Sequence, residues 1–201
     1  MCNLYTQTTA QQAMVQLFRA TRDVAGNVEP GDIYPDRVAP IIRNSAEGRE
    51  LAKGRWGMPT PPMFIKGKAD RGVTNIRNTA SPHWRRWLSP ENRCLVPFDR
   101  FAEPKPGGNA WFTLTKGQGA FAGIWTEWTS VRKVKDGETT DQLFGFLTTT
   151  PNAVVGAVHP KAMPVILTNP DDWDLWMTAP WSEAKALQRP LDDDLLRLIE
   201  D

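Results

Sequence analysis

The second half of the chain consists of short runs of apolar, aromatic and β-branched residues separated by turn-forming residues. These runs cover residues 94–101, 110–115, 120–128, 143–150 and 163–168. Each run has the length and composition of a β-strand, and the Gly, Pro, Asn and Asp residues between them are typical of turns. The pattern predicts a mostly antiparallel sheet.

Short helices are expected outside these runs. A capping-box pattern at Thr9, followed by apolar residues at helical spacing, predicts a helix that ends near Ala20. Ser81-Pro82 indicates a helical turn, Asn169-Pro170 begins another helix, and the leucines of 195–199 predict a last one. Residues 21–62 are rich in Gly and Pro and are expected to form loops with edge strands.

The fold class that follows is α+β, in one domain. A chain of 201 residues fits one domain of typical size, and 40% apolar residues with nine Trp and eight Phe suffice for a core. No basic-then-apolar leader and no run of 18 apolar residues is found. We therefore expect a cytoplasmic, monomeric protein without a membrane partner.

The charge balance is even overall but uneven locally. The net charge is +1, which excludes a general field that attracts polyanions. Residues 66–93, however, hold seven basic and two acidic side chains, interleaved with Trp84 and Trp87. This combination suits a groove for single-stranded nucleic acid, and equally a solvated helix face beside two core tryptophans.

Cysteine and histidine are scarce. Two of each, Cys2, Cys94, His83 and His159, cannot build a paired Cys-x-x-Cys zinc site or a disulfide framework. We therefore expect a reducing compartment, no metal and no cofactor.

Cys2 follows Met1 directly, so removal of Met1 would leave a free 1,2-aminothiol. Such a group captures an aldehyde by forming an imine that the neighbouring thiol closes to a thiazolidine. An α-amine with a pKa of about 7.7–8.0 is roughly a tenth unprotonated at pH 7, far more than a lysine. The alternative is that Cys2 belongs to a frayed terminus without a role.

Imine formation requires proton transfer, for which a carboxyl or imidazole must lie close by. Glu103 ends the apolar run that begins at Arg93, and His159 lies between two core-forming segments. Both are candidates for this role. A structural role as satisfied polar residues is the alternative for each.

Taken together, the blocks of the chain resemble the SOS-response-associated peptidase (SRAP) family of DNA-repair proteins. The resemblance is carried in order by Met1-Cys2, 38–40, 55–59, 75–77, 93–97, 101–103, 121–125 and 159–167. It implies one SRAP-like domain over residues 1–201, with a barrel-like sheet core flanked by short helices.

The resemblance also implies an activity. Members bind abasic sites in single-stranded DNA and form a thiazolidine crosslink through the N-terminal cysteine, which shields the lesion. Carried over to this chain, Cys2 is the nucleophile and Asn75 holds the sugar. Glu103 transfers protons, including those for removal of Met1 and reversal of the adduct, and His159 assists sugar opening. We expect the thiol to be exposed at the floor of a positively lined furrow.

DNA contacts are implied for a second set of residues. Arginines and a lysine would bind phosphate, and two apolar residues would lie near the cleft and stack on or displace bases. These residues are Arg77, Arg85, Arg86, Lys161, Trp56 and Pro40.

Several positions depart from the family pattern. Asn3 and Leu4 replace the usual Gly-Arg, Thr79 replaces an acidic residue, and Pro104 replaces the tryptophan after the glutamate. The histidine motif is one residue longer, with Lys161 as the substitute for arginine.

Two other functions remain open on the sequence. One is a cysteine peptidase with Cys2 as nucleophile and His159 as base, in its simplest form removing its own Met1. The other is a non-covalent single-stranded DNA-binding module that uses the basic, Trp-containing segment.

Overall fold

The computed structural model describes residues 2–199, and its centre is a closed ring of five strands. In ring order these are β11 (Gly137–Thr149), β10 (Gly119–Lys133), β7 (Arg93–Phe98), β4 (Val38–Ser45) and β5 (Gly48–Trp56). A parallel pairing between β5 and β11 closes the ring, while the other four pairings are antiparallel. The predicted α+β fold with a mostly antiparallel, barrel-like core is therefore confirmed.

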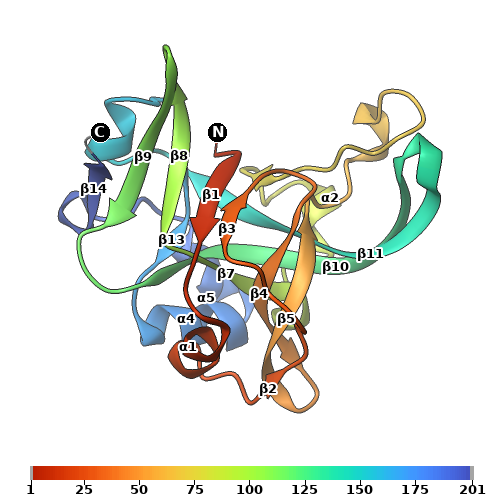
Figure 1. Cartoon of the computed structure of the whole chain (residues 1–201), viewed down its shortest axis with the longest axis horizontal. Helices are drawn as coiled ribbons and strands as arrows, with labels where there is room; N and C mark the ends of the chain where they lie inside the picture. Colours follow the sequence, from red (N-terminus) through yellow and green to blue (C-terminus); the bar gives the residue numbers. More distant parts are fainter. Residues whose placement is uncertain (1, 200–201) are drawn as a thin grey trace.

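A second, antiparallel sheet of five strands packs against the barrel. Its order is β14 (Leu196–Ile199), β9 (Gly108–Leu114), β8 (Arg100–Lys105), β1 (Leu4–Gln7) and β3 (Gly31–Ile33). Figure 1 shows β8, β1 and β3 next to one another, with the N-terminus at the end of β1. The start of the chain is thus an inner strand, paired on both edges.

Four two-residue strands attach to the barrel strands. They are β2 (Arg22–Asp23), β6 (Asn75–Ile76), β12 (Met163–Pro164) and β13 (Ile166–Leu167). The α-helices are short, and α1, α4 and α5 lie together below the barrel in Figure 1. Their bounds are α1 Gln11–Leu17, α2 Pro82–Arg85, α3 Ala153–Gly156, α4 Pro170–Thr178 and α5 Trp181–Ala184. None of the helices in residues 2–199 has the length and apolar character that crossing a membrane requires.

Two apolar clusters hold these layers together. One lies between the barrel and the helices and contains Met14, Trp84, Trp173 and Trp176. The other lies between the two sheets, where Phe101 of β8 meets Phe121 of β10 with ring centroids 6.0 Å apart. Burial of aromatic side chains on this scale is the main source of stability for such a domain.

Glycine allows the narrow barrel to close. A Cβ atom at Gly123 of β10 would lie 2.8 Å from Cys94 Sγ, and one at Gly54 of β5 would lie 2.9 Å from Phe144 Cδ1. Both distances are too short for real contacts, so a larger residue at either position would force the Cys94 or Phe144 side chain to shift.

Two of the predicted helix starts were correct, and one was wrong. Asn169 caps α4 by accepting a hydrogen bond from the Asp172 amide at 2.9 Å, as predicted, and Trp84 is buried on the predicted turn at Pro82. The capping box at Thr9 was wrong, because the Thr9 hydroxyl instead donates to Asp99 at 2.8 Å, and α1 spans only Gln11–Leu17.

Two further predictions were wrong. Residues 38–56 form β4 and β5, which are inner barrel strands of eight and nine residues, and not edge strands. The predicted last helix is β14, in which Leu196 is buried against the sheet and Leu198 is 41% exposed. Pairing with β9 satisfies the backbone of β14, an alternative that the leucine spacing does not reveal.

Candidate active site at the start of strand β1

Cys2 precedes β1 and lies in the apolar cluster between the two sheets. Its side chain is completely buried, and its thiol donates to the Leu4 carbonyl at 3.5 Å. Burial, together with the carboxylate of Glu103, raises the pKa of this thiol well above its usual range. The expectation of an exposed thiol was therefore wrong: neighbours from both sheets cover Cys2.

Asn75 binds the backbone of Cys2. Its Nδ2 donates to the Cys2 carbonyl at 2.6 Å and to Thr74 Oγ1 at 2.9 Å. Strand β6 positions the side chain, because Asn75 pairs with Phe146 of the barrel strand β11. The amide oxygen Oδ1 is buried and accepts no hydrogen bond within residues 2–199, which leaves one acceptor available at this point.

Glu103 and His159 form a buried pair beside Cys2. Glu103 lies on β8 with no exposed surface, and its Oε2 is 3.6 Å from Nδ1 of His159, whose side chain is 13% exposed. Burial raises the pKa of the Glu103 carboxyl above its usual value of 4.5, and the neighbouring imidazole opposes that rise. A raised pKa favours the protonated carboxyl, which can act as a proton donor.

The orientation of the imidazole follows from its contacts. His159 Nδ1 lies 3.0 Å from the Ala162 carbonyl, which can only accept, so Nδ1 carries a proton. The backbone amide of His159 donates to Val155 at the end of α3. The ring is thus fixed by a short helix and the loop that follows it.

These contacts bring together four residues that lie far apart in the sequence. Asn75 contacts Cys2 directly, Glu103 interacts with the Cys2 thiol and with His159, and each comes from a different element. The cluster combines a thiol, an amide acceptor, a buried carboxyl and an imidazole. It offers groups for nucleophilic addition and for proton transfer in one place.

Tyr5 is a neighbour that the sequence did not indicate. Its ring lies 5.2 Å from that of Trp56 and its hydroxyl is buried with no partner in residues 2–199. Tyr5 belongs to the same apolar cluster as Cys2 and Cys94, and burial, with a smaller contribution from these thiols, raises its pKa. Only the folded β1 brings it there, and no motif marks it.

The structure keeps four of the predicted DNA-contacting residues on the surface. Arg77, Arg85 and Lys161 are exposed, and Arg77 is two residues beyond Asn75. Arg86 is exposed but is held by its neighbours: its guanidinium lies 4.6 Å from the Trp87 ring and its Nε donates to the His83 carbonyl at 3.2 Å.

One predicted DNA contact, Trp56, was wrong, and a second residue, Pro40, lies on another face than the Cys2 cluster. Trp56 has no exposed surface, stacks on Phe146 and donates its indole N–H to the Thr74 carbonyl at 3.2 Å, so it cannot stack on a base. Pro40 is buried on β4 between Ala39 and Ile41, which belong to the Cys2 cluster. Because side chains alternate along a strand, Pro40 points to the other face.

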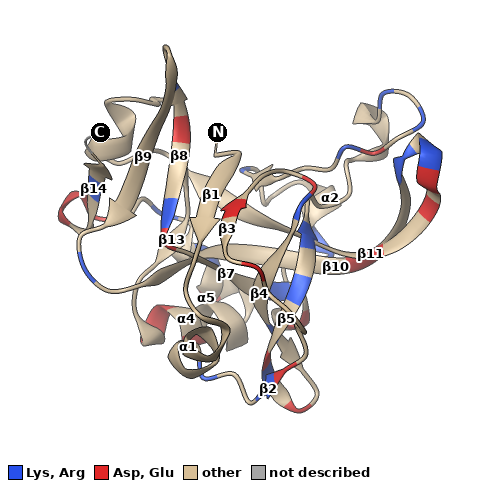
Figure 2. Cartoon of the chain, viewed as in Figure 1, with Lys and Arg blue, Asp and Glu red and all other residues tan. Residues whose placement is uncertain are grey.

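Basic residues are spread over several elements of the fold (Figure 2). Figure 2 shows Lys and Arg on several elements, among them the loop before β6 and the tip of the β10–β11 hairpin. No group of three His, Cys, Asp or Glu side chains in residues 2–199 is arranged to hold a metal ion.

The fold is a mixed five-stranded barrel covered by a second sheet, and Cys2, Asn75, Glu103 and His159 meet where the two sheets and the loop after α3 come together. The chain belongs to the SOS response associated peptidase (SRAP) family, whose model matches residues 1–200. A search of curated proteins found no match.

Solved structures share the whole fold. A protein from Bordetella bronchiseptica is 24% identical with a TM-score of 0.75 and 100% coverage of both chains. A protein from Bacteroides thetaiotaomicron is 18% identical, also with a TM-score of 0.75, over 98% of this chain and 90% of that one. A phage-related protein from Bordetella bronchiseptica is 21% identical with a TM-score of 0.72, over 98% and 93%.

Proposed function

We propose that this protein captures abasic sites in single-stranded DNA by forming a thiazolidine through Cys2 after removal of Met1. The observation that carries the proposal is the contact network of Asn75 with Cys2 and of Glu103 with His159. Membership of the SRAP family supports it. The reaction needs no leaving group other than water.

Covalent capture forms a C–N bond and then a C–S bond to the same aldehyde carbon. The Cys2 α-amine adds to the aldehyde carbon of the ring-opened deoxyribose and gives a carbinolamine, which loses water to form an imine. The sulfur then adds to the imine carbon, and the thiol proton passes to the ring nitrogen. One water molecule is released in total, and no oxidant or reductant is consumed.

Each neighbour has a role in this sequence. Glu103, whose pKa is raised by burial, donates the proton that converts the carbinolamine hydroxyl into water. His159 is fixed beside Glu103 and exchanges the proton with it. Asn75 Oδ1, which is buried and available as an acceptor, accepts a hydrogen bond from a hydroxyl group of the sugar.

The order of bond formation favours aldehyde capture over peptide hydrolysis in trans, because the α-amine makes the first bond to the aldehyde, whereas peptide hydrolysis begins with attack by the thiol. A cysteine peptidase attacks as a thiolate, so it needs a lowered thiol pKa. The pKa of Cys2 is raised and its side chain is covered. The peptidase alternative is thus reduced to the removal of Met1, a step within the chain itself.

The test is adduct formation on an oligonucleotide that carries one abasic site. We expect a product that survives denaturation with the native N-terminus, and none after Cys2→Ala. Cys94→Ala is the matched control, because Cys94 is the other buried thiol, and it should keep the adduct. An adduct that persists in Cys2→Ala would point to a lysine imine and refute the proposal.

A further inference from the structure

The C-terminal strap, residues 188–193, leads from the helices into β14 and contains neither α-helix nor β-strand. Hydrogen bonds join it to two segments that carry site residues. One segment is the chain that leaves β6 after Asn75, and the other is α3, which precedes His159. Neither connection belongs to a helix or a sheet, so individual side chains make both.

Gln188 makes the first connection. Its Nε2 donates to the Arg77 carbonyl at 2.9 Å and to the Thr148 carbonyl at 3.0 Å. Its Oε1 accepts a hydrogen bond from Thr79 Oγ1 at 3.0 Å. The side-chain amide thus uses both of its donor hydrogens and its acceptor on the chain beside β6 and on β11.

The position of this amide continues a ladder that the backbone does not. The parallel pairing of β6 with β11 places Asn75 opposite Phe146 and ends one residue later. The next residues on the two strands are Arg77 and Thr148, and both of their carbonyls accept from the one Nε2 of Gln188. The bridge holds the Arg77 backbone against the barrel, while the Arg77 side chain stays exposed.

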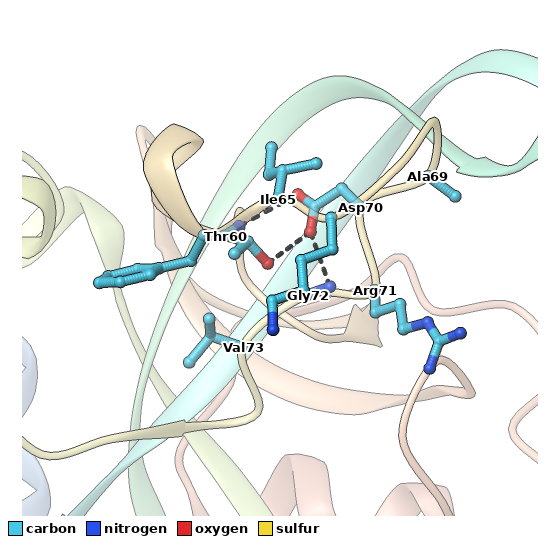
Figure 3. A pocket seen from close by; sticks show the side chains of 9 residues that line it. Thr60, Ile65, Ala69, Asp70, Arg71, Gly72 and Val73 are labelled. Atoms are coloured by element: carbon cyan, nitrogen blue, oxygen red, sulfur yellow. Dashed lines mark hydrogen bonds between the residues drawn. The ribbon is translucent and has the colours of Figure 1, made fainter.

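The chain before Asn75 is held in a different way. Asp70 is 6% exposed and accepts hydrogen bonds from the Thr60 amide at 3.0 Å, the Thr60 hydroxyl at 2.5 Å and the Gly72 amide at 2.8 Å. Figure 3 shows these bonds as dashed lines within the loop that joins β5 to β6. Strand β6 is therefore anchored by its own loop at the start and by the C-terminal strap at the end.

Asn152 makes the second connection. Its Nδ2 donates to the Leu191 carbonyl at 3.0 Å, and its Oδ1 accepts from the Val155 amide at 2.9 Å as the N-cap of α3. The Val155 carbonyl in turn accepts from the backbone amide of His159 at 2.8 Å. Asn152 is 8% exposed, so water does not readily replace these bonds. The strap thus fixes the start of the short helix whose end holds His159.

We propose that the C-terminal strap positions both sides of the candidate active site. Gln188 sets Arg77 for its expected phosphate contact, and Leu191 sets the imidazole of His159 through Asn152 and α3. Gln188 and Asn152 are positioning residues, because each acts through the residue that it holds. The inference rests on the proposed function, and it assigns the two connections to different steps, DNA binding and proton transfer.

The Gln188 connection is tested by single-turnover adduct formation over a range of DNA concentrations. Methionine is close to glutamine in shape and cannot donate, so Gln188→Met should raise the half-saturating DNA concentration about fivefold and leave the maximal rate unchanged. Arg77→Ala should raise it at least as much, and Gln188→Met should add nothing in the Arg77→Ala background. Gln16→Met, at an exposed position of α1, is the matched control and should change neither quantity.

The Asn152 connection predicts the opposite division. Serine keeps a capping oxygen but lacks Nδ2, so Asn152→Ser should lower the maximal rate about tenfold and leave the half-saturating DNA concentration unchanged. It should cause no further loss in a His159→Ala background. Asn109→Ser, at an exposed position of β9, is the matched control and should keep the full rate.

Two further variants test the same connections if the first ones do not fold. Thr79→Val removes the donor to Gln188 Oε1 and should raise the half-saturating concentration by a smaller factor. Asn152→Asp keeps the capping oxygen, removes the donor to Leu191, and should lower the maximal rate.

The inference would be overturned if the Gln188 and Asn152 variants changed both quantities alike. Losses that add in full to those of Arg77→Ala and His159→Ala would also overturn it, because the strap would then stabilise the fold without setting these two side chains. Failure of the unaltered protein to form any adduct would instead refute the proposed function. Fluorescence anisotropy with an intact single-stranded oligonucleotide would in that case still test whether Gln188→Met weakens binding through Arg77.

Discussion

Replacing Glu103 by glutamine should separate the chemistry of the site from its stability. The carboxyl is completely buried, and glutamine has the same shape but can neither ionise nor transfer the proton. Loss of a general acid slows a reaction by about 100- to 10 000-fold. We expect adduct formation by Glu103→Gln to slow within that range, while binding of intact single-stranded DNA stays unchanged.

The same substitution should stabilise the fold at neutral pH. Because burial raises the pKa of Glu103 above 4.5, the ionised carboxyl is less stable in the folded chain than in the unfolded chain. The contribution of Glu103 to the unfolding free energy is therefore largest below about pH 4.5. It falls as the pH rises through the pKa of Glu103 in the folded protein. Each pKa unit of the rise costs about 1.4 kcal/mol of unfolding free energy, and glutamine removes that cost.

The assay pairs single-turnover adduct formation with urea denaturation between pH 4 and pH 8. Glu127→Gln is the control, since Glu127 is an exposed acid on β10, and it should change the unfolding free energy by less than about 0.5 kcal/mol. Fast adduct formation by Glu103→Gln would refute the proton-transfer role. A pH-independent stability difference would refute the assignment of the raised pKa to burial.

Three further predictions concern Asn75, Cys2 and Trp56. Asn75→Ala should lower the unfolding free energy by about 1–3 kcal/mol, because it leaves the buried Cys2 carbonyl without its donor, and should also slow adduct formation; unchanged stability in urea would contradict this. Alkylation of Cys2 should be slow in the folded protein and fast in urea, with Cys94, the other buried thiol, as the internal reference; fast alkylation of Cys2 in the folded protein would contradict its burial. Trp56→Ala should cost about 3–5 kcal/mol in urea denaturation, as expected for a fully buried indole, and a loss of DNA binding without that cost would show that Trp56 contacts DNA after all.

Elements governed by local signals could be predicted from the sequence. The N-cap of α4 depends on Asn169 and a proline that follows it directly, and both act within one turn. The strands of residues 93–149 were visible because the turn residues between them are equally local. Their closure into a ring was not, since it depends on a parallel pairing between β5 and β11 that joins residues about ninety positions apart.

Burial within the site was the main feature that the sequence could not give. Trp56 and Cys2 were expected at a surface, yet both lie in the cluster between the two sheets. The burial of Cys2 follows from β1 pairing with β3 and β8 at once, and that of Trp56 from its packing against Tyr5 and Phe146. Both are tertiary arrangements with no local signature. Asn75, Glu103 and His159 could be nominated singly, but only the packing of β6, β8 and the loop after α3 sets them around Cys2.

The most direct test of covalent capture is mass spectrometry of the digested adduct. The account predicts a single modified peptide that begins at Cys2, with a mass equal to peptide plus DNA remnant minus one water. The label on a lysine, on Cys94 or on a peptide that still carries Met1 would contradict it.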